Sequence, residues 1–263
     1  MKRYLIPVLA LVALALPSGA QARVIELGAG GSPPGASNCP DDPCVAAYQV
    51  TAYQGRAGTL KNPFVVPRAG SIVAFSVSLG KLTPTQIEFF NGRFGEDPQV
   101  RLSILRRSTR KGRKGNHRLM RQSEVYDVTR FLGSTPTFAL DEPLRVGKDA
   151  RVAITVPTWA PLLDTVSLAR SDWWRASRAE DECGKDDELS PPSVQDEVGE
   201  IVDYQCTYFN SRLLYTATYI PDPKPTDGSD KTEKQAQGAK AAAVANDAAR
   251  GAATAVRGGA AAP

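Results

Sequence analysis

The clearest regular pattern in the chain is Val100-Arg101-Leu102-Ser103-Ile104-Leu105. Large apolar residues stand at positions 100, 102 and 104, and polar residues lie between them. Because successive side chains of a β-strand point to opposite faces, this period of two predicts a strand with one buried face.

The same alternation recurs on both sides of this stretch. The clearest further strands are predicted at residues 73–79, 152–156, 202–208 and 213–219, and weaker ones at 45–53, 119–123, 137–140 and 144–146. Short runs separated by Gly, Pro, Asn and Asp indicate an all-β fold, an antiparallel sandwich or barrel.

The connections between these strands also carry predictions. Gly147-Lys148-Asp149 predicts a turn in which the glycine takes the positive φ. No stretch within residues 45–220 predicts an amphipathic helix of three turns. Residues 85–95 are expected to form a long connection whose aromatic side chains, Phe89, Phe90 and Phe94, cap one end of the core.

The first 22 residues have the three parts of a bacterial secretory signal peptide. Lys2 and Arg3 are positive, residues 5–16 are apolar, and Ala20-Gln21-Ala22 has the form of a cleavage site. The apolar run is too short for a permanent membrane span, and no later stretch predicts a transmembrane segment. We therefore expect an exported protein, secreted or associated with the cell surface.

Composition divides the rest of the chain into three parts. Residues 23–44, rich in Gly and Pro, predict an irregular lead-in, and residues 45–220 predict the β-sandwich domain. Residues 221–263 begin with spaced prolines and become rich in Ala and Gly. They offer too little apolar surface to offset the entropy of ordering, which predicts a disordered or weakly helical tail.

Four cysteines in an exported chain predict two disulfides. They are Cys39, Cys44, Cys183 and Cys206, for which three pairings are possible. We favour Cys39–Cys44 and Cys183–Cys206, because the first two enclose a turn-rich hexapeptide. A zinc site is the alternative, but the spacings fit no standard finger and the single histidine, His117, lies far away in a basic loop.

Several stretches of the chain, taken together, are familiar from other proteins. They are Pro67-Arg68-Ala69-Gly70-Ser71-Ile72-Val73, Pro98-Gln99-Val100-Arg101-Leu102-Ser103-Ile104-Leu105-Arg106, Pro136-Thr137-Phe138, Pro143-Leu144-Arg145-Val146, Val152-Ala153-Ile154, and Trp174-Arg175-Ala176-Ser177-Arg178 followed by Cys183 and Cys206. Over residues 60–220 the chain resembles a jelly-roll-like β-sandwich domain of uncharacterised exported bacterial proteins. The resemblance implies that fold and no activity.

A dense positive cluster lies in and beside a predicted hairpin loop. Its members are Arg106, Arg107, Arg110, Lys111, Arg113, Lys114, Arg118 and Arg121. The formal net charge of +4 falls to +2 once the charges of Lys2 and Arg3 are subtracted, which argues against a dedicated nucleic-acid binder. The cluster instead predicts attraction to a cell-envelope glycan or anionic polymer. A solvated loop that keeps the hairpin edges unpaired is the alternative.

Three tryptophans are candidates for stacking on a sugar ring, namely Trp159, Trp173 and Trp174. Neighbouring residues of a strand face opposite sides, so at most one of the last two faces the core. The other is expected near Arg175 or Arg178. The alternative is that both pack, one in the core and one under the loop of residues 179–200.

An acidic run surrounds the third cysteine. It comprises Glu180, Asp181, Glu182, Asp186, Asp187 and Glu188. Oxygen ligands suit calcium, but the spacing matches no EF-hand. We favour a solvated face and predict no cofactor, with calcium binding and pairing to the basic hairpin as the alternatives.

Catalytic motifs such as G-x-S-x-G and H-E-x-x-H are missing from the sequence. His117 is expected among cations that lower its basicity. Asp196, Glu197 and Glu200 leave a glycan hydrolase open as an alternative. The leading prediction is an exported, non-catalytic binding or envelope-associated protein, and the runner-up is a purely structural or protein-interaction module.

Overall fold

The computed structural model describes residues 23–29, 35–108, 115–166, 168–184 and 189–224. The chain divides into two compact units between Asp222 and Pro223, and the elements below belong to the first. The predicted signal peptide and residues 225–263 of the predicted tail lie outside the described residues. Within the described ranges, no helix has the length and apolar character needed to cross a membrane.

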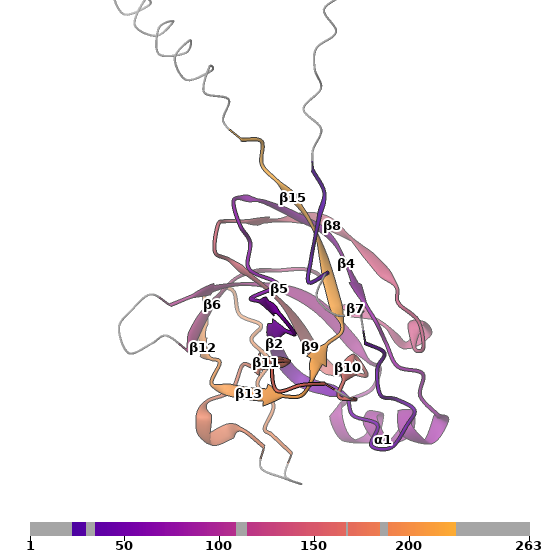
Figure 1. Cartoon of the computed structure of the whole chain (residues 1–263). Coiled ribbons are helices and arrows are strands. Elements are labelled where there is room, and N and C mark those ends of the chain that lie inside the picture. Colours follow the sequence, from indigo (N-terminus) through magenta and orange to yellow (C-terminus); the bar gives the residue numbers. More distant parts are fainter. Residues whose placement is uncertain (1–22, 30–34, 109–114, 167, 185–188, 225–263) are drawn as a thin grey trace, which may run out of the picture. The chain divides into compact units, whose positions relative to one another are not determined.

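Antiparallel strands build two main sheets, which confirms the all-β prediction (Figure 1). The four-stranded sheet has the order β1 (Ile25–Leu27), β15 (Tyr215–Pro221), β4 (Gly70–Val77) and β8 (Thr137–Val146). The nine-stranded sheet has the order β12 (Ile201–Asp203), β6 (Asn116–Gln122), β5 (Gln99–Arg107), β9 (Arg151–Ala160), β2 (Ala47–Ala57), β11 (Trp173–Ala176) and β13 (Cys206–Phe209), with β3 (Leu60–Lys61) on β2 and β7 (Tyr126–Asp127) on β5. A separate pair joins β10 (Leu163–Asp164) to β14 (Arg212–Leu213).

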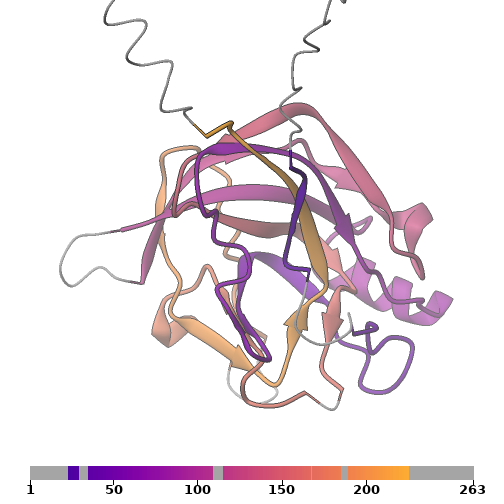
Figure 2. The ribbon, with the colours of Figure 1, turned by 45° about the horizontal axis from the view of Figure 1, so that its top comes forward.

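The two main sheets face each other as in a β-sandwich (Figure 2), and the side chains between them form the main hydrophobic core. Leu102 and Ile104 enter it from β5 and Phe75 from β4, at positions the alternation predicts. A register shift between Ile72 and Ala74 in the β4–β8 pairing departs from the expected pattern. Ile72 is therefore fully buried at the start of this strand, where the alternation favoured Val73.

The outer face of the nine-stranded sheet is partly covered by residues 193–200 together with Tyr204, here called the covering segment. Its centre is Gln195, which is fully buried. The Gln195 backbone N–H donates to Thr51 Oγ1 (3.1 Å), and its side-chain Nε2 donates to the His117 carbonyl (3.1 Å). The Tyr204 hydroxyl donates to Gln195 Oε1 (2.8 Å). These bonds hold the covering segment against the sheet.

Both disulfides have the pairing favoured from the sequence. Cys39 is bonded to Cys44 and Cys183 to Cys206, and no cysteine is free. This pairing leaves no thiolate for a zinc site, and it indicates an oxidising, extracytoplasmic compartment.

A helix, α1 (Pro84–Phe94), occupies the expected connection, so the prediction of no three-turn helix was wrong. The Gln86 N–H donates to Thr83 Oγ1 (3.3 Å) and the Thr83 N–H donates to Gln86 Oε1 (2.9 Å), which is a capping box. Phe90 and Phe94, one turn apart, are buried in a cluster with Trp159. This cluster is separate from the main core, and Phe89 is exposed.

Three smaller predictions also need correction. The lead-in is not wholly irregular, because it contains β1. The weak strands at 137–140 and 144–146 are one strand, β8. In the turn before β9, the positive φ of 65° belongs to Asp149 and not to Gly147. Two short 3-10 helices, η1 (Thr129–Phe131) and η2 (Glu180–Glu182), complete the described elements.

The two disulfides should differ in their contribution to stability. Replacing Cys183 and Cys206 by serine should lower the free energy of unfolding by about 3.5 kcal/mol, because that bond spans 23 residues of the unfolded chain. Replacing Cys39 and Cys44, which are separated by 5 residues, should lower it by about 2 kcal/mol. Urea unfolding of both double variants measures the difference, and a larger loss for the short loop would contradict it.

Candidate functional site

Beyond the covering segment, the outer face of the nine-stranded sheet carries three arginines from three strands. Arg107 ends β5, Arg151 begins β9 and Arg175 lies in β11. We call these three residues the arginine cluster. In the strand register Arg151 is opposite Leu105, two residues before Arg107, and Arg175 is opposite Tyr53. Residues two apart share a face, so the pairing brings the three side chains to the same side of the sheet.

Aromatic rings lie beneath two of these guanidinium groups. Arg151 Cζ is 4.6 Å from the centroid of the Tyr53 ring, and Arg175 Cζ is 5.8 Å from that of Trp173. The Trp173 ring rests on Gly55 of β2, where any Cβ would collide with it. A cation above an aromatic face is attracted by the ring quadrupole, which holds both arginines against the sheet.

Among the described residues, no carboxylate oxygen lies within 4.0 Å of the Arg151 or Arg175 guanidinium. Burial lowers the pKa of Arg151, and the positive charges of Arg107 and Arg175 lower it further. Arg175 Nη1 donates to the Tyr204 carbonyl (3.3 Å), but its Nε is buried without a hydrogen-bond partner in the described part of the chain. An anion placed here would relieve this repulsion.

His117 borders the cluster and is not in the loop where the sequence placed it. It lies in β6 and is 1% exposed. Its pKa is lowered to about 3, first by burial and then by the charge of Arg151, with Arg107 and Arg175 adding to the effect. His117 is therefore neutral at physiological pH, with Nδ1 3.1 Å from the Gly115 carbonyl. The prediction that neighbouring cations lower the pKa of His117 agrees with this arrangement.

The buried His117 should make stability depend on pH. Its folded-state pKa of about 3 lies below the ordinary value of 6.5, so between these values the unfolded chain binds a proton that the folded chain does not. The stabilisation from neutral His117 is present above pH 6.5 and is lost as the pH falls towards 3. Between pH 7 and pH 5 this group should remove about 2 kcal/mol from the free energy of unfolding.

A His117→Gln variant isolates this contribution, because it lacks the titrating ring. It should lose about 2 kcal/mol less than the unsubstituted protein between pH 7 and pH 5, measured by urea unfolding. Parallel pH profiles for the two proteins would show that His117 is not held neutral.

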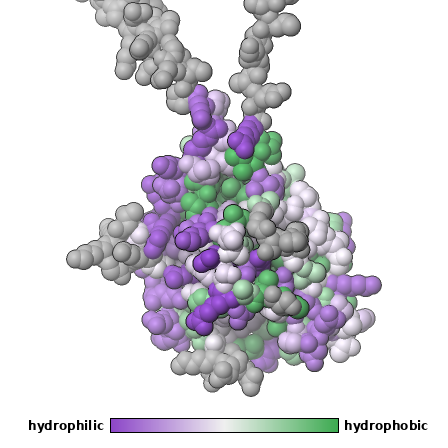
Figure 3. Space-filling model, in the orientation of Figure 1, coloured by the Kyte–Doolittle hydropathy of each residue, from purple (hydrophilic) through white to green (hydrophobic). Residues whose placement is uncertain are grey.

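The basic hairpin of the sequence prediction is partly visible. Arg106, Arg118 and Arg121 are exposed on β5 and β6, and Arg118 Nη1 donates to the Gly199 carbonyl (2.6 Å). Hydrophilic side chains gather on this side of the molecule, at the left of Figure 3. The remaining predicted cations, Arg110, Lys111, Arg113 and Lys114, lie outside the described residues. Of the cations predicted in and beside the hairpin, Arg107 lies with Arg151 and Arg175 in the arginine cluster. The sequence did not predict that Arg151 and Arg175 belong to this site.

Only one predicted stacking residue reaches this face. Trp173 is half-buried beside Arg175, as the alternation of β11 predicts. Trp174 is buried on the core side, which rules out the stacking role proposed for it at this surface. Trp159 is fully buried, stacks on Phe90 with centroids 5.0 Å apart, and donates from Nε1 to Asn91 (3.0 Å). Its burial removes it from the stacking candidates.

The acidic run forms no metal centre in the described residues. Glu180, Asp181 and Glu182 form η2 and are exposed, whereas Asp186, Asp187 and Glu188 lie outside the described residues. Within the described ranges, no three His, Cys, Asp or Glu side chains converge on a possible ion site. The described ion pairs, Arg145–Asp222 and Arg212–Asp172, do not join the acidic run to the basic hairpin.

The carboxylates considered for hydrolysis lie within the covering segment. Burial raises the pKa of Glu200, and the charges of Glu197 and Asp196 raise it further. Glu200 Oε2 is buried without a hydrogen-bond partner in the described residues. A raised pKa suits a general acid, but no nucleophile or base is positioned against it by any described contact.

Comparison of the chain with family models, curated proteins and solved structures gave no match. The resemblance to exported jelly-roll-like domains therefore stays a prediction, and the chain is assigned to no family.

Proposed function

We propose that this protein is an exported, non-catalytic binding protein whose arginine cluster contacts an anionic polymer of the cell envelope, such as an acidic glycan. Export is part of the proposal and rests on the signal-peptide pattern together with the two disulfides. The jelly-roll-like strand topology belongs to the proposal as well.

One observation carries the proposal. Arg151 and Arg175 are half-buried on an accessible sheet face, and each lies over an aromatic ring without a carboxylate partner in the described residues. A guanidinium fork binds carboxylate or sulfate oxygens in bidentate geometry, and its preorganisation reduces the entropy lost on binding. Trp173 lies between Gly55 and the Arg175 guanidinium, so its ring supports Arg175 rather than offering a free face to a sugar.

The arrangement suits a polymer better than a compact ligand. Arg106, Arg118 and Arg121 add exposed positive charge nearby, although their pairings in β5 and β6 direct them to the face of the sheet opposite Arg107. An extended polyanion contacts many such charges together, so weak individual contacts accumulate. Exposed charges are screened by salt, and binding should therefore weaken steeply as ionic strength rises.

Replacing Arg151 and Arg175 by serine should weaken binding to polygalacturonate, a carboxylated polysaccharide, by tenfold or more at low salt. Each lost charge-assisted contact is worth about 1.5 kcal/mol, which corresponds to about tenfold in affinity. Isothermal titration with the folded variant measures the change, and neutral dextran serves as the control polymer.

The matched control removes two arginines elsewhere. Arg93 at the end of α1 and Arg130 in η1 are both exposed, and Arg130 also lies over an aromatic ring, 5.6 Å from the Phe131 centroid. The Arg93→Ser/Arg130→Ser variant has the same net charge as the test variant and should bind almost normally. Equal weakening of binding in both variants would show that only the net charge matters and not the arginine cluster. If the unsubstituted protein does not bind the polymer, a purely structural module is favoured instead.

A further inference from the structure

A cavity of about 560 Å³ lies at one end of the core, away from the arginine cluster. Its wall includes Trp174 of β11, Tyr208 of β13, Leu163 of β10, and Arg178 and Ser190 from the segments that follow β11. The volume is in the range of small-molecule sites, which combine an apolar wall with a few placed polar groups.

Arg178 is the unusual member of this wall. It is 3% exposed, yet no carboxylate in the described residues lies within 4.0 Å of it. Its Nε donates to the Pro191 carbonyl (3.1 Å) and its Nη1 to the Tyr208 hydroxyl (3.4 Å). Its Nη2 is buried without a hydrogen-bond partner in the same described residues. A buried cation without a counter-charge destabilises the folded protein unless an anion offsets it.

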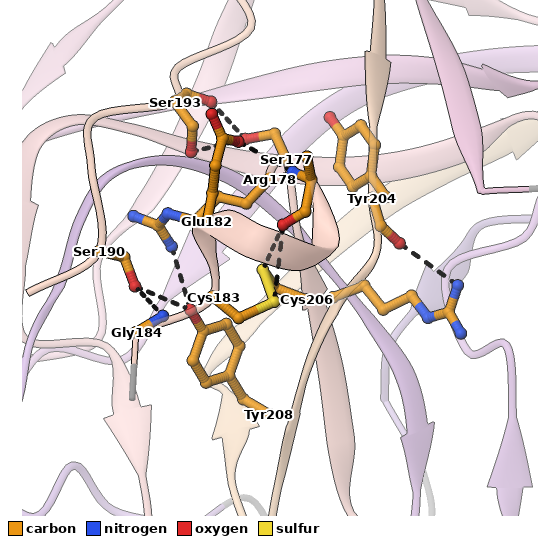
Figure 4. Close-up of a disulfide and its surroundings, with 12 residues drawn as sticks. Ser177, Arg178, Glu182, Cys183, Gly184, Ser190, Ser193, Tyr204, Cys206 and Tyr208 are labelled. Atoms are coloured by element: carbon orange, nitrogen blue, oxygen red, sulfur yellow. Dashed lines mark hydrogen bonds between the residues drawn. A yellow bond between two sulfur atoms is a disulfide. The ribbon is translucent and has the colours of Figure 1, made fainter. Parts of the chain in front are cut away.

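The polar side of the cavity is held in place by a hydroxyl network and a disulfide (Figure 4). The Tyr208 hydroxyl is 3.2 Å from Ser190 Oγ, which accepts from the Gly184 N–H (2.8 Å). The Cys183–Cys206 bond ties the residue before Gly184 to the strand that carries Tyr208. The groups around Arg178 are therefore fixed before any ligand arrives, which lowers the entropic cost of binding.

The other side of the cavity is aromatic and apolar. The rings of Trp174 and Tyr208 stack with centroids 4.3 Å apart, and Leu163 lies on the same lining. Trp174 Nε1 donates to Ser211 Oγ (2.8 Å), so its one polar atom is already satisfied and its ring offers apolar contact only. The cavity thus combines one positive group with a flat apolar wall.

We propose that this cavity binds a small organic monocarboxylate with a flat apolar body. The carboxylate supplies a counter-charge that no described residue gives Arg178, and the body lies against Trp174 and Tyr208. The site is separate from the arginine cluster, and it stands or falls independently of the polymer-binding function.

The test uses a panel of aromatic and alkyl monocarboxylates, beginning with phenylacetate, each paired with its neutral amide. Titrations of the full chain are followed by NMR through the indole N–H resonance of Trp174. At least one carboxylate should bind with a Kd below about 1 mM, and its amide should bind at least tenfold more weakly because it brings no charge. Absence of binding across the panel, or equal binding of carboxylates and amides, would overturn the proposal.

Variants locate the site. Arg178→Gln should weaken carboxylate binding at least tenfold. Because that change lies in a buried network, a second variant, Thr165→Trp, fills the cavity from its exposed rim and should also block binding. Val166→Trp is the matched control, because it places the same ring at the adjacent exposed position, which does not line the cavity. This variant should bind carboxylates normally. Loss of binding in Arg151→Ser/Arg175→Ser, with retention in Thr165→Trp, would place the ligand at the arginine cluster instead.

Discussion

The hydrogen bonds of Gln195 hold the covering segment on the outer face of the nine-stranded sheet. They therefore determine which part of that face is buried and which part is accessible to solvent. A broad sheet has two faces, and here one lies on the main hydrophobic core while the other carries a smaller buried cluster that includes Tyr53, Leu105 and Tyr204. Gln195 is fully buried and satisfies its side chain on the His117 carbonyl and the Tyr204 hydroxyl. Beneath it, the hydroxyls of Thr51 and Thr155 bond to each other (2.8 Å). Leaving such groups unpaired in a dry layer is costly, so the covering segment is fixed in position.

Beyond the covering segment, positive charge and not buried hydrogen bonding dominates the outer face of the nine-stranded sheet. Arg151 and Arg175 rest on Tyr53 and Trp173, and their charges repel each other without a described carboxylate to balance them. The cavity around Arg178 shows the same imbalance in a more enclosed setting. An open charged face suits an extended polyanion, whereas an enclosed cation beside stacked rings suits a small anion. The difference in burial is what separates the two proposed ligands.

Much of the fold follows from local patterns in the sequence. The alternation around Leu102 and Ile104 predicted a strand correctly, and the short Cys39–Cys44 spacing predicted the disulfide pairing. Helix α1 was missed because its exposed Phe89 blurs the helical period, although Thr83 and Gln86 of its capping box are readable in the sequence. The arginine cluster could not be predicted, because it depends on β9 and β11 lying beside β5 and β2. The alternation of apolar and polar residues within one segment does not show which distant strand will pair with it.

The central claim is that an anionic polymer binds to the arginine cluster on the outer face of the nine-stranded sheet. NMR of the folded protein, with a short galacturonate oligomer added at low salt, tests this claim residue by residue. If the polymer binds there, the Nε–Hε signals of Arg151 and Arg175 and the indole signal of Trp173 shift together and saturably. Unmoved signals at these three residues, with shifts confined to other arginines such as Arg93 and Arg130, would contradict it.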